Sequence, residues 1–168
     1  MKVKIKKLNE NAKIPYKTHD EDFCYDVVAT SCEEIAPNVW KYGLGLAFEV
    51  KRDYEPLLQQ NSNQATFPTY TSADLSKSPI NLSIDLRPRS SIWKTGMVLS
   101  NSTGTLDEFY RGEVSAVFYH IMTNMPKYEI GDRIAQIKIG LTLPIQFEEA
   151  DTLNTTERGE GGYGSTGK

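Results

Sequence analysis

Long apolar runs are missing from this chain of 168 residues, and no stretch approaches the roughly 18 apolar residues of a membrane span. The basic start, MKVKIKKL, alternates charged and apolar residues and so lacks the continuous apolar region of a signal peptide. Two cysteines, Cys24 and Cys32, make neither a disulfide framework nor a four-ligand zinc site. These absences predict a soluble, cytoplasmic protein that has no membrane partner.

The chain has no large excess of either positive or negative charge, and it has only two histidines. The net charge of −3 argues against a duplex nucleic-acid binder, because such proteins need excess Lys and Arg to displace counterions. A compact polyanion such as a nucleotide remains compatible with this charge, since a few local cations and backbone N–H groups can bind it. His19 and His120 are more typical of a surface and a strand residue than of metal ligands.

No segment shows a long helical period, and alternation with period two dominates instead. Apolar side chains alternate in four rows, at residues 44–50, 80–86, 135–141 and 143–147. Residues 114–121 are apolar on both faces, which predicts a central strand or one covered by another subunit. The chain is therefore predicted to be all-β, and its many short strands favour a barrel or a double-sheet roll.

Two segments interrupt the alternation. Residues 53–79 are rich in Gln, Asn, Ser, Thr and Pro, which indicates a long surface loop between two strands. The tail has five glycines within residues 158–167, so it forms no stable strand or helix alone. Its end, GYGSTGK, matches a P-loop skeleton, but no helix follows to direct N–H groups at a phosphate. A flexible arm is expected instead.

Five segments carry polar groups suited to binding and hydrolysing a phosphate chain. They are FCYDVVA at 23–29, RPRSS at 87–91, GTLDEFYRG at 104–112, GDRIAQ at 131–136 and RGEGGYGSTG at 158–167. The segment at 104–112 is turn-like, with a glycine at each end, and taken alone it predicts a β-hairpin. In this order the five segments resemble the five motifs of the trimeric dUTPase family. The resemblance spans nearly the whole chain except residues 53–79, and the third and fifth motifs are long and nearly intact.

The resemblance implies a fold, an assembly and an activity. The expected fold is a jelly-roll-like β-barrel over residues 1–151, with the insertion at 53–79 and a glycine-rich arm at 152–168 that closes over the active site. The expected assembly is a homotrimer with active sites between subunits. The expected reaction is hydrolysis of dUTP to dUMP and pyrophosphate, which limits uracil in DNA and supplies dUMP for thymidylate synthesis.

The resemblance also assigns roles to residues around the reacting phosphorus. Asp107 matches the general base that deprotonates the attacking water, a task for a carboxylate that is ionised at neutral pH. Asp26 matches the aspartate that helps to hold Mg²⁺, through a coordinated water, because this ion keeps several waters and takes other ligands from phosphates. The expected phosphate contacts before the arm are Arg89, Ser90, Ser91 and Gln136.

The remaining matches concern the nucleoside and the arm. Asn101 and the backbone at Gly104, Thr105 and Leu106 match the surface that reads uracil, and Tyr110 matches the tyrosine that stacks under deoxyribose. An amide edge paired with uracil leaves the reversed pattern of cytosine unpaired. The expected arm contacts are Arg158, Gly162, Tyr163, Gly164, Ser165 and Thr166, with the tyrosine capping the base and most of the others near the γ-phosphate.

Two departures from the family pattern and two alternatives stay open. Phe23 and Cys24 stand where the family has Ala-Gly, which strains Cys24 if a positive φ is needed, and Phe109 stands where an acid is usual. A dCTP deaminase of the same fold is disfavoured, because its glutamate base corresponds to Val117. A regulatory protein of this fold would instead bind a protein partner through residues 53–79.

Overall fold

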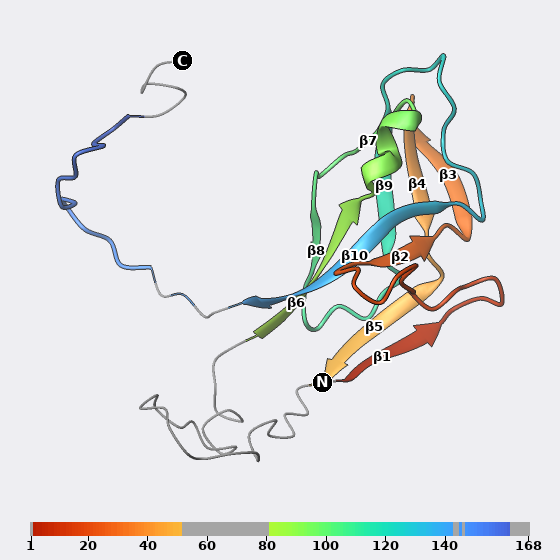
Figure 1. Cartoon of the computed structure of the whole chain (residues 1–168), viewed down its shortest axis with the longest axis horizontal. Coiled ribbons are helices and arrows are strands. Elements are labelled where there is room, and N and C mark those ends of the chain that lie inside the picture. The colour runs from red at the N-terminus through yellow and green to blue at the C-terminus, as the bar shows by residue number, and fades with distance from the viewer. Residues whose placement is uncertain (1, 52–80, 143–144, 146, 162–168) are drawn as a thin grey trace.

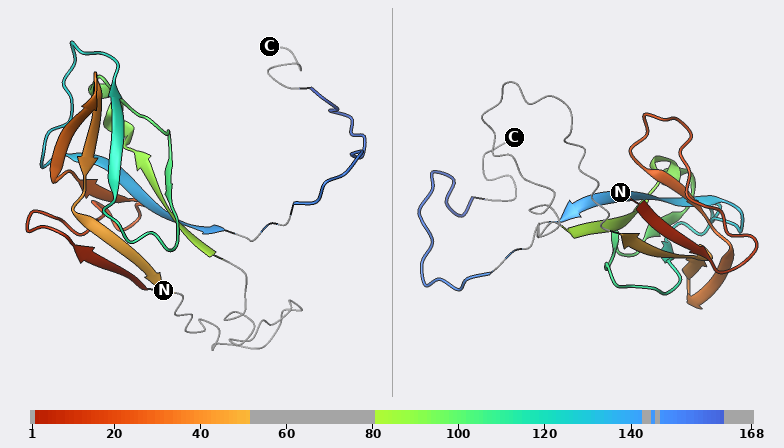
Figure 2. Two further views of the ribbon diagram at one scale, coloured as in Figure 1. Left: turned by 180° about the vertical axis from the view of Figure 1, so that it is seen from behind. Right: turned by 90° about the horizontal axis from the view of Figure 1, so that it is seen from below.

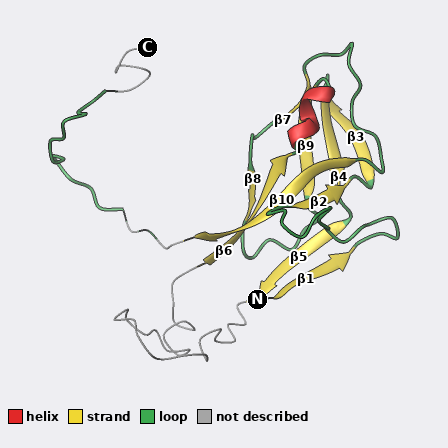
Figure 3. Ribbon diagram, viewed as in Figure 1, coloured by secondary structure: helices red, strands yellow, loops and turns green. Residues whose placement is uncertain are grey.

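The computed structural model describes residues 2–51, 81–142, 145 and 147–161. Those residues form ten strands and one short 3-10 helix, η1 (Ser90–Lys94), in agreement with the predicted all-β class (Figures 1 and 3). Within the same residues, no helix is long and apolar enough to span a bilayer. The insertion at 53–79 and the end of the arm, residues 162–168, lie outside the described residues.

Two four-stranded antiparallel sheets and one two-stranded sheet make up the fold. The first sheet, in spatial order, contains β2 (Tyr25–Val28), β10 (Arg133–Thr142), β6 (Asn81–Pro88) and β8 (Gly104–Leu106). The second contains β3 (Ser31–Ala36), β4 (Val39–Gly43), β9 (Ser115–His120) and β7 (Met97–Leu99). The pair consists of β1 (Lys2–Lys7) and β5 (Leu46–Lys51).

One continuous apolar core joins all three sheets. It combines Ile84 and Ile137 of the first sheet with Phe118 of the second and Phe48 of β5. Three aromatic rings pack edge to face at its centre, with centroids 5.8 Å apart for Tyr42 and Phe118 and 5.4 Å apart for Phe118 and Tyr128.

The two tyrosines of this cluster are joined by a hydrogen bond as well as by ring contact. The Tyr42 hydroxyl donates to the Tyr128 carbonyl at 2.8 Å. Burial raises the pKa of both phenols, because an ionised oxygen would lose its hydration there. The positive charge of Arg89 acts in the opposite direction on the pKa of Tyr128, but burial dominates.

Much of the predicted strand pattern is confirmed. Rows 44–50, 80–86 and 135–141 contribute buried side chains from β5, β6 and β10, among them Leu46, Leu86 and Ala135. Strand β9 lies between β4 and β7, as its apolar character predicted. The fourth row is wrong: Ile145 and Phe147 lie in no strand and are 73% and 91% exposed. Alternation alone does not make a strand where no neighbouring strand is paired to it.

A β-bulge in β10 reorders which side chains share a face. The register against β2 shifts between Arg133 and Ala135, and Ile134 and Ala135 are both fully buried although they are adjacent. The extra residue therefore returns Arg133 and Gln136 to the same outer face of the sheet. This face also carries Asp26, which lies opposite Gln136 in the ladder.

The C-terminal segment leaves the sheets after β10. Residues 147–161 form no strand or helix, and they lie apart from the barrel in all three ribbon orientations (Figures 1 and 2). Tight turns interrupt this path, for example where the Gly161 amide donates to the Arg158 carbonyl at 3.0 Å. The predicted division between a barrel at 1–151 and an arm at 152–168 stays a prediction.

Candidate functional site

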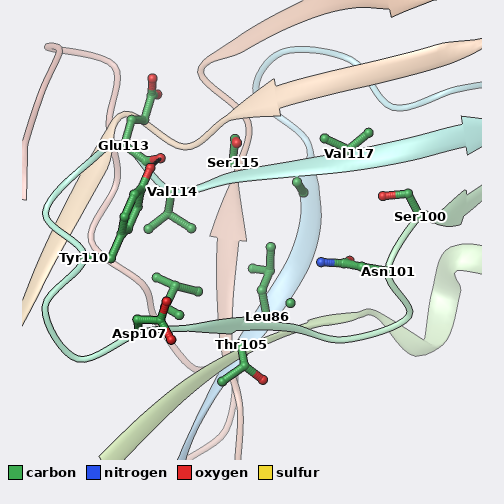
Figure 4. A pocket seen from close by; sticks show the side chains of 13 residues that line it. Leu86, Ser100, Asn101, Thr105, Asp107, Tyr110, Glu113, Val114, Ser115 and Val117 are labelled. Atoms are coloured by element: carbon green, nitrogen blue, oxygen red, sulfur yellow. Dashed lines mark hydrogen bonds between the residues drawn. The ribbon is translucent and has the colours of Figure 1, made fainter.

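Two separate polar pockets hold most of the described residues for which the sequence predicts a role. The first, the Asp107 pocket, has a volume of about 290 Å³ (Figure 4). It is lined by Leu86, Ser100, Asn101, Gly104, Thr105, Leu106, Asp107, Tyr110, Glu113, Val114, Ser115, Ala116 and Val117. The second, the Asp26 pocket, has a volume of about 310 Å³ and is lined by Tyr16, Thr18, Asp22, Phe23, Cys24, Asp26, Arg89, Ser90 and Gln136.

The Asp107 pocket is formed where the chain passes from one sheet to the other. Residues 104–112 were expected to form a β-hairpin, and this expectation is wrong. Strand β8 pairs with β6 in the first sheet, whereas β9 pairs with β4 and β7 in the second. The connection therefore spans the gap between the sheets, and residues 107–114 wrap around the cavity instead of closing a ladder.

Side chains from opposite rims of the Asp107 pocket converge on its interior. Asn101 lies at one side and Tyr110 at the other, with Asp107 below them and Val117 above in the view of Figure 4. Gly104 leaves room for the amide, because a Cβ at this position would lie 3.0 Å from Asn101 Nδ2. The Asp107 carboxylate makes no side-chain hydrogen bond or ion pair with the described residues, so it is available to a ligand.

Backbone bonds hold the connection after Asp107 in place. The Tyr110 amide donates to the Asp107 carbonyl at 3.0 Å, which closes a tight turn. The Arg111 guanidinium donates to the Glu108 and Tyr110 carbonyls at 2.6 and 3.0 Å. Arg111 also donates to the Phe48 carbonyl of β5 at 3.5 Å. It is thus committed to backbone carbonyls, and none of the side chains lining the Asp107 pocket is cationic.

An ion-pair network built on Asp26 organises the second pocket. Arg89 donates from Nε to Asp26 Oδ1 at 2.9 Å and from Nη2 to Oδ2 at 3.4 Å. Arg133 donates to the same Oδ2 at 2.9 Å and to Thr18 Oγ1 at 3.3 Å. The Asp26 side chain is only 13% exposed, so an unpaired charge there would be costly. The two guanidinium groups supply the opposite charge that this carboxylate needs.

The turn that follows β6 completes this pocket. Arg89 also donates to Ser91 Oγ at 3.2 Å, and Gln136 Nε2 donates to the Pro88 carbonyl at 3.1 Å. These bonds fix the start of η1, where Ser90 is exposed at the pocket wall. Cys24, which also lines the pocket, is absent from the non-glycine residues with positive φ. The strain that Cys24 would have brought at a glycine position is therefore not present.

The chemical contents of the two pockets are complementary, and no residue lines both. One contains the Asp107 carboxylate, which has no side-chain partner in the described part of the chain, beside an amide and a phenol. The other contains guanidinium, hydroxyl and amide donors, which suit phosphate oxygens. The Asp107 pocket has a carboxylate but no cationic side chain, whereas the Asp26 carboxylate of the second pocket is already paired with Arg89.

Comparison with known proteins identifies the family. A family model for dUTPase matches residues 47–167. The deoxyuridine 5'-triphosphate nucleotidohydrolase of Nautilia profundicola is 33% identical over 170 residues, covering 100% of both chains. The chain belongs to the dUTPase family.

Solved structures of dUTPases share the fold. The dUTPase of Staphylococcus bacteriophage 80alpha with dUPNHPP has a TM-score of 0.70 at 19% identity, covering 99% of each chain. A mutant dUTPase from phage phi11 of S. aureus, described as showing the coordination of a structural Mg(II) ion, has a TM-score of 0.63 at 16% identity. It covers 90% of this chain and 98% of its own. These likenesses show that the three-sheet arrangement is the dUTPase fold.

The predicted dUTPase residues fall into three groups in the structure. The Asp107 pocket is lined by the residues that are expected to read the nucleoside and to activate the water. The Asp26 pocket is lined or braced by the residues that are expected to contact the phosphates and the metal. Arg158 lies in the segment apart from both, where its Nε donates to the Gly161 carbonyl at 2.9 Å. Gly162, Tyr163, Gly164, Ser165 and Thr166 lie outside the described residues.

Sequence reasoning missed two contributors. Arg133 had no predicted binding role, yet it shares Asp26 with Arg89. The adjacent apolar residues Ile134 and Ala135 break the alternation of the strand, and this break was the available signal for the bulge. Glu113 lines the Asp107 pocket although no role had been assigned to it. Its side chain reaches the bend between β4 and β5, and nothing in the sequence indicates that meeting.

Proposed function

We propose that this protein hydrolyses dUTP to dUMP and pyrophosphate. Family membership supports the activity, and the complementary chemistry of the two pockets is the structural observation that carries it. A nucleoside triphosphate has an apolar, hydrogen-bonding head and a polyanionic tail. The Asp107 pocket suits the head, and the Asp26 pocket suits the tail.

Nucleoside recognition is assigned to the Asp107 pocket. The Asn101 amide and the backbone of Gly104, Thr105 and Leu106 offer donors and acceptors to the edge of uracil. Cytosine presents the reversed pattern and would leave those groups unpaired, and a mismatch of that kind can lower the rate by about 10⁴-fold. The Tyr110 ring would form the wall under deoxyribose, so that a ribose 2′-hydroxyl meets it and UTP is rejected.

The Asp107 carboxylate is the proposed general base. It accepts a proton from a water molecule, whose oxygen then bonds to the α-phosphorus. The bond between this phosphorus and the bridging oxygen breaks, and pyrophosphate leaves with that oxygen. The absence of a competing partner on Asp107 among the described side chains supports this role, because a base needs a free lone pair directed at its water.

The phosphate chain is assigned to the Asp26 pocket and the arm. Ser90 and Gln136 would donate to phosphate oxygens from the pocket wall, while Arg89 and Ser91 brace the same turn. Arg158, Gly162, Gly164, Ser165 and Thr166 would add donors from the arm, and Tyr163 would cap the base. Each charge-assisted hydrogen bond contributes about 1.5–3 kcal/mol net. Several together offset about 1–2 kcal/mol of backbone entropy per ordered arm residue.

The Asp26 pocket can bind Mg²⁺ only through water molecules that are coordinated to the ion. Three of the approximately four lone pairs on the Asp26 carboxylate are taken by Arg89 and Arg133. One position is left to accept from a water bound to Mg²⁺. The described residues contain no group of three or more His, Cys, Asp or Glu that could hold a metal. Most ligands would therefore come from the triphosphate and from water, and the ion would neutralise charge on the phosphates.

We further propose a homotrimer whose active sites lie between subunits. One chain has its base and its cationic groups in pockets with no shared residue. Pairing the Asp107 pocket of one copy with the Asp26 pocket of another would bring both to a single substrate. A partner-binding role for residues 53–79 and a cytoplasmic location stay predictions.

Pyrophosphate release from dUTP, dCTP, dTTP and UTP tests the function directly. Wild type should hydrolyse dUTP far more efficiently than the other three nucleotides, and Asp107→Asn should lower kcat for dUTP by about 100-fold or more. Asp20→Asn, an exposed aspartate outside both pockets, is the matched control and should leave kcat unchanged. A kcat for dUTP that does not change in Asp107→Asn would contradict the proposed role of Asp107 as general base. Ammonia release from dCTP would favour a deaminase, against which Val117 on the pocket wall already argues.

A further inference from the structure

Glu113 makes a contact that joins the Asp107 pocket to a distant turn. Its Oε1 accepts a hydrogen bond of 2.7 Å from the backbone amide of Gly45, 68 residues away in the chain. Gly45 is a buried residue with a φ of 63°, at the bend between β4 and β5. A buried amide needs a partner, and among the described residues the Glu113 carboxylate provides it.

Glycine leaves the space in which the Glu113 carboxylate sits. A Cβ on Gly43 would overlap Ser31 Oγ and would lie 2.6 Å from Glu113 Oε1, closer than atoms of this kind approach. The next residue is also fixed, because the Val114 amide donates to the Leu46 carbonyl at 2.8 Å. The backbone at Glu113 is thus held against the bend between β4 and β5 from two adjacent positions.

Tyr110 depends on the same short stretch of backbone. Its hydroxyl donates to the Glu113 carbonyl at 2.9 Å. The ring packs so closely over Gly112 that a Cβ there would lie 2.6 Å from the ring carbon Cζ. In Figure 4 the Tyr110 ring and Glu113 lie together at one end of the pocket. A shift of the backbone at 112–113 would therefore move the Glu113 carbonyl away from the Tyr110 hydroxyl.

We propose that Glu113 is a positioning residue that sets sugar specificity by fixing the wall formed by Tyr110. The carboxylate binds the Gly45 amide, this bond holds the backbone at Glu113, and the Glu113 carbonyl holds the Tyr110 hydroxyl. The proposal rests on the proposed function, in which Tyr110 excludes the ribose 2′-hydroxyl. Glu113 touches neither the substrate nor the reacting water in this role.

The ratio of kcat/KM for dUTP to that for UTP is the measurement, because loss of folded protein lowers both values equally and leaves the ratio unchanged. Glu113→Ala should lower the ratio about tenfold, since a misplacement near 1 Å can cost up to about a hundredfold. Glu113→Gln keeps an oxygen that can accept from the Gly45 amide and should restore most of the ratio. Glu33→Ala, an exposed glutamate on β3, is the control and should leave it unchanged.

A double-variant cycle separates positioning from general loosening. In a Tyr110→Phe background the hydroxyl is gone, so Glu113→Ala should no longer change the ratio. An equal fall in both backgrounds, or no fall with Glu113→Ala in wild type, would overturn the proposal. Should Glu113→Ala not fold, Gly43→Ala in a Ser31→Ala background crowds the same carboxylate without meeting Ser31 Oγ, and it should lower the ratio in its place, whereas Ser31→Ala alone should not.

Failure of the proposed function would look different. A wild type that releases no pyrophosphate from dUTP would refute the activity without touching the contact between Glu113 and Tyr110. NMR of ¹³C-tyrosine rings then decides, with the Tyr110 signal identified by its absence in Tyr110→Phe. Glu113→Ala should shift that signal and Glu33→Ala should not. An unchanged Tyr110 signal in Glu113→Ala would contradict the positioning role, whether or not the protein hydrolyses dUTP.

Discussion

Arg89 and Asp26 lie 63 residues apart in the chain, and their side chains meet in a two-point ion pair whose shorter contact, from Nε to Oδ1, is 2.9 Å. The pair connects β2 to the turn after β6, and Arg133 joins it from β10 through the same carboxylate. One carboxylate therefore determines the position of two guanidinium groups beside the proposed phosphate site.

Replacing Asp26 with Asn should destabilise the fold as well as weaken catalysis. The amide keeps the shape of the carboxylate but leaves two guanidinium groups without their counter-charge. We expect the free energy of unfolding to fall by about 2–3 kcal/mol, measured by urea denaturation, with a lower kcat/KM for dUTP. The exposed pair Lys4–Glu49, at 3.3 Å, gives the control. Glu49→Gln should cost under about 1 kcal/mol, and an equal cost for both variants would contradict the expectation.

Gly112→Ala should affect the Tyr110 ring. An added Cβ would overlap the phenol oxygen and lie 2.6 Å from Cζ, so the ring must move. We expect kcat/KM for dUTP to fall by about tenfold or more, within the range for small misplacements, with weaker discrimination against UTP. Gly140→Ala on β10, where the added Cβ would meet only Ser83 Oγ at 3.1 Å, should change neither value. Unaltered kinetics in Gly112→Ala would show that the ring position is not critical.

Alkaline pH should unfold the protein through its buried tyrosines. Burial raises the pKa of Tyr42 and Tyr128 above the value near 10 that a phenol has in the unfolded chain. A raised folded pKa means that this stability is fully present below about pH 10 and is lost as pH rises toward the folded pKa. The unfolding free energy should fall by up to about 1.4 kcal/mol per pH unit for each tyrosine.

Urea unfolding between pH 9 and pH 11 measures that loss. Tyr128→Phe removes one of the two groups and should reduce the slope, whereas Tyr119→Phe, an exposed tyrosine on β9, should not. A stability that stays flat above pH 10 would mean that the two phenols ionise as readily in the folded protein as in the unfolded chain.

The arm should lose mobility when nucleotide binds. Amide hydrogen exchange after about Asp151 should slow on addition of the dUTP analogue dUPNHPP in the presence of Mg²⁺, because the arm gains phosphate contacts only then. Arg158→Ala removes one charge-assisted donor and should raise KM by about tenfold or more. Lys138→Ala, on β10 outside both pockets, is the control. Exchange that does not respond to the analogue would refute arm closure.

Alternation of apolar residues was enough to predict the strands, but it could not assign them to sheets. In rows such as 82–86 the apolar side chains lie on the buried face, because a two-residue alternation matches the pleat of a strand. The pairing of β8 with β6 instead of β9 depends on long-range packing, so residues 104–112 were mistaken for a hairpin. The row ending at Phe147 shows the reverse error, since alternation predicts a strand only where a partner is available.

The candidate site was predicted through motifs, and its supporting contacts were not. Asp107, Asn101 and Tyr110 came from one matched segment and its surroundings, and they line one pocket. The bond between Glu113 and Gly45 joins residues 68 apart at a bend that no motif marks. Arg133 reaches Asp26 only because a bulge reverses its face of the strand. Such contacts follow from the folded path of the chain, which local patterns do not specify.

The distribution of base and cations over two pockets with no common residue has a genetic consequence. A subunit damaged at Asp107 keeps an intact phosphate half, and one damaged at Arg89 keeps an intact nucleoside half. Where active sites are shared between neighbours, two such inactive alleles expressed together would regenerate some whole sites in mixed oligomers. An allele in which both residues are damaged would not rescue a second allele that has lost either one of them.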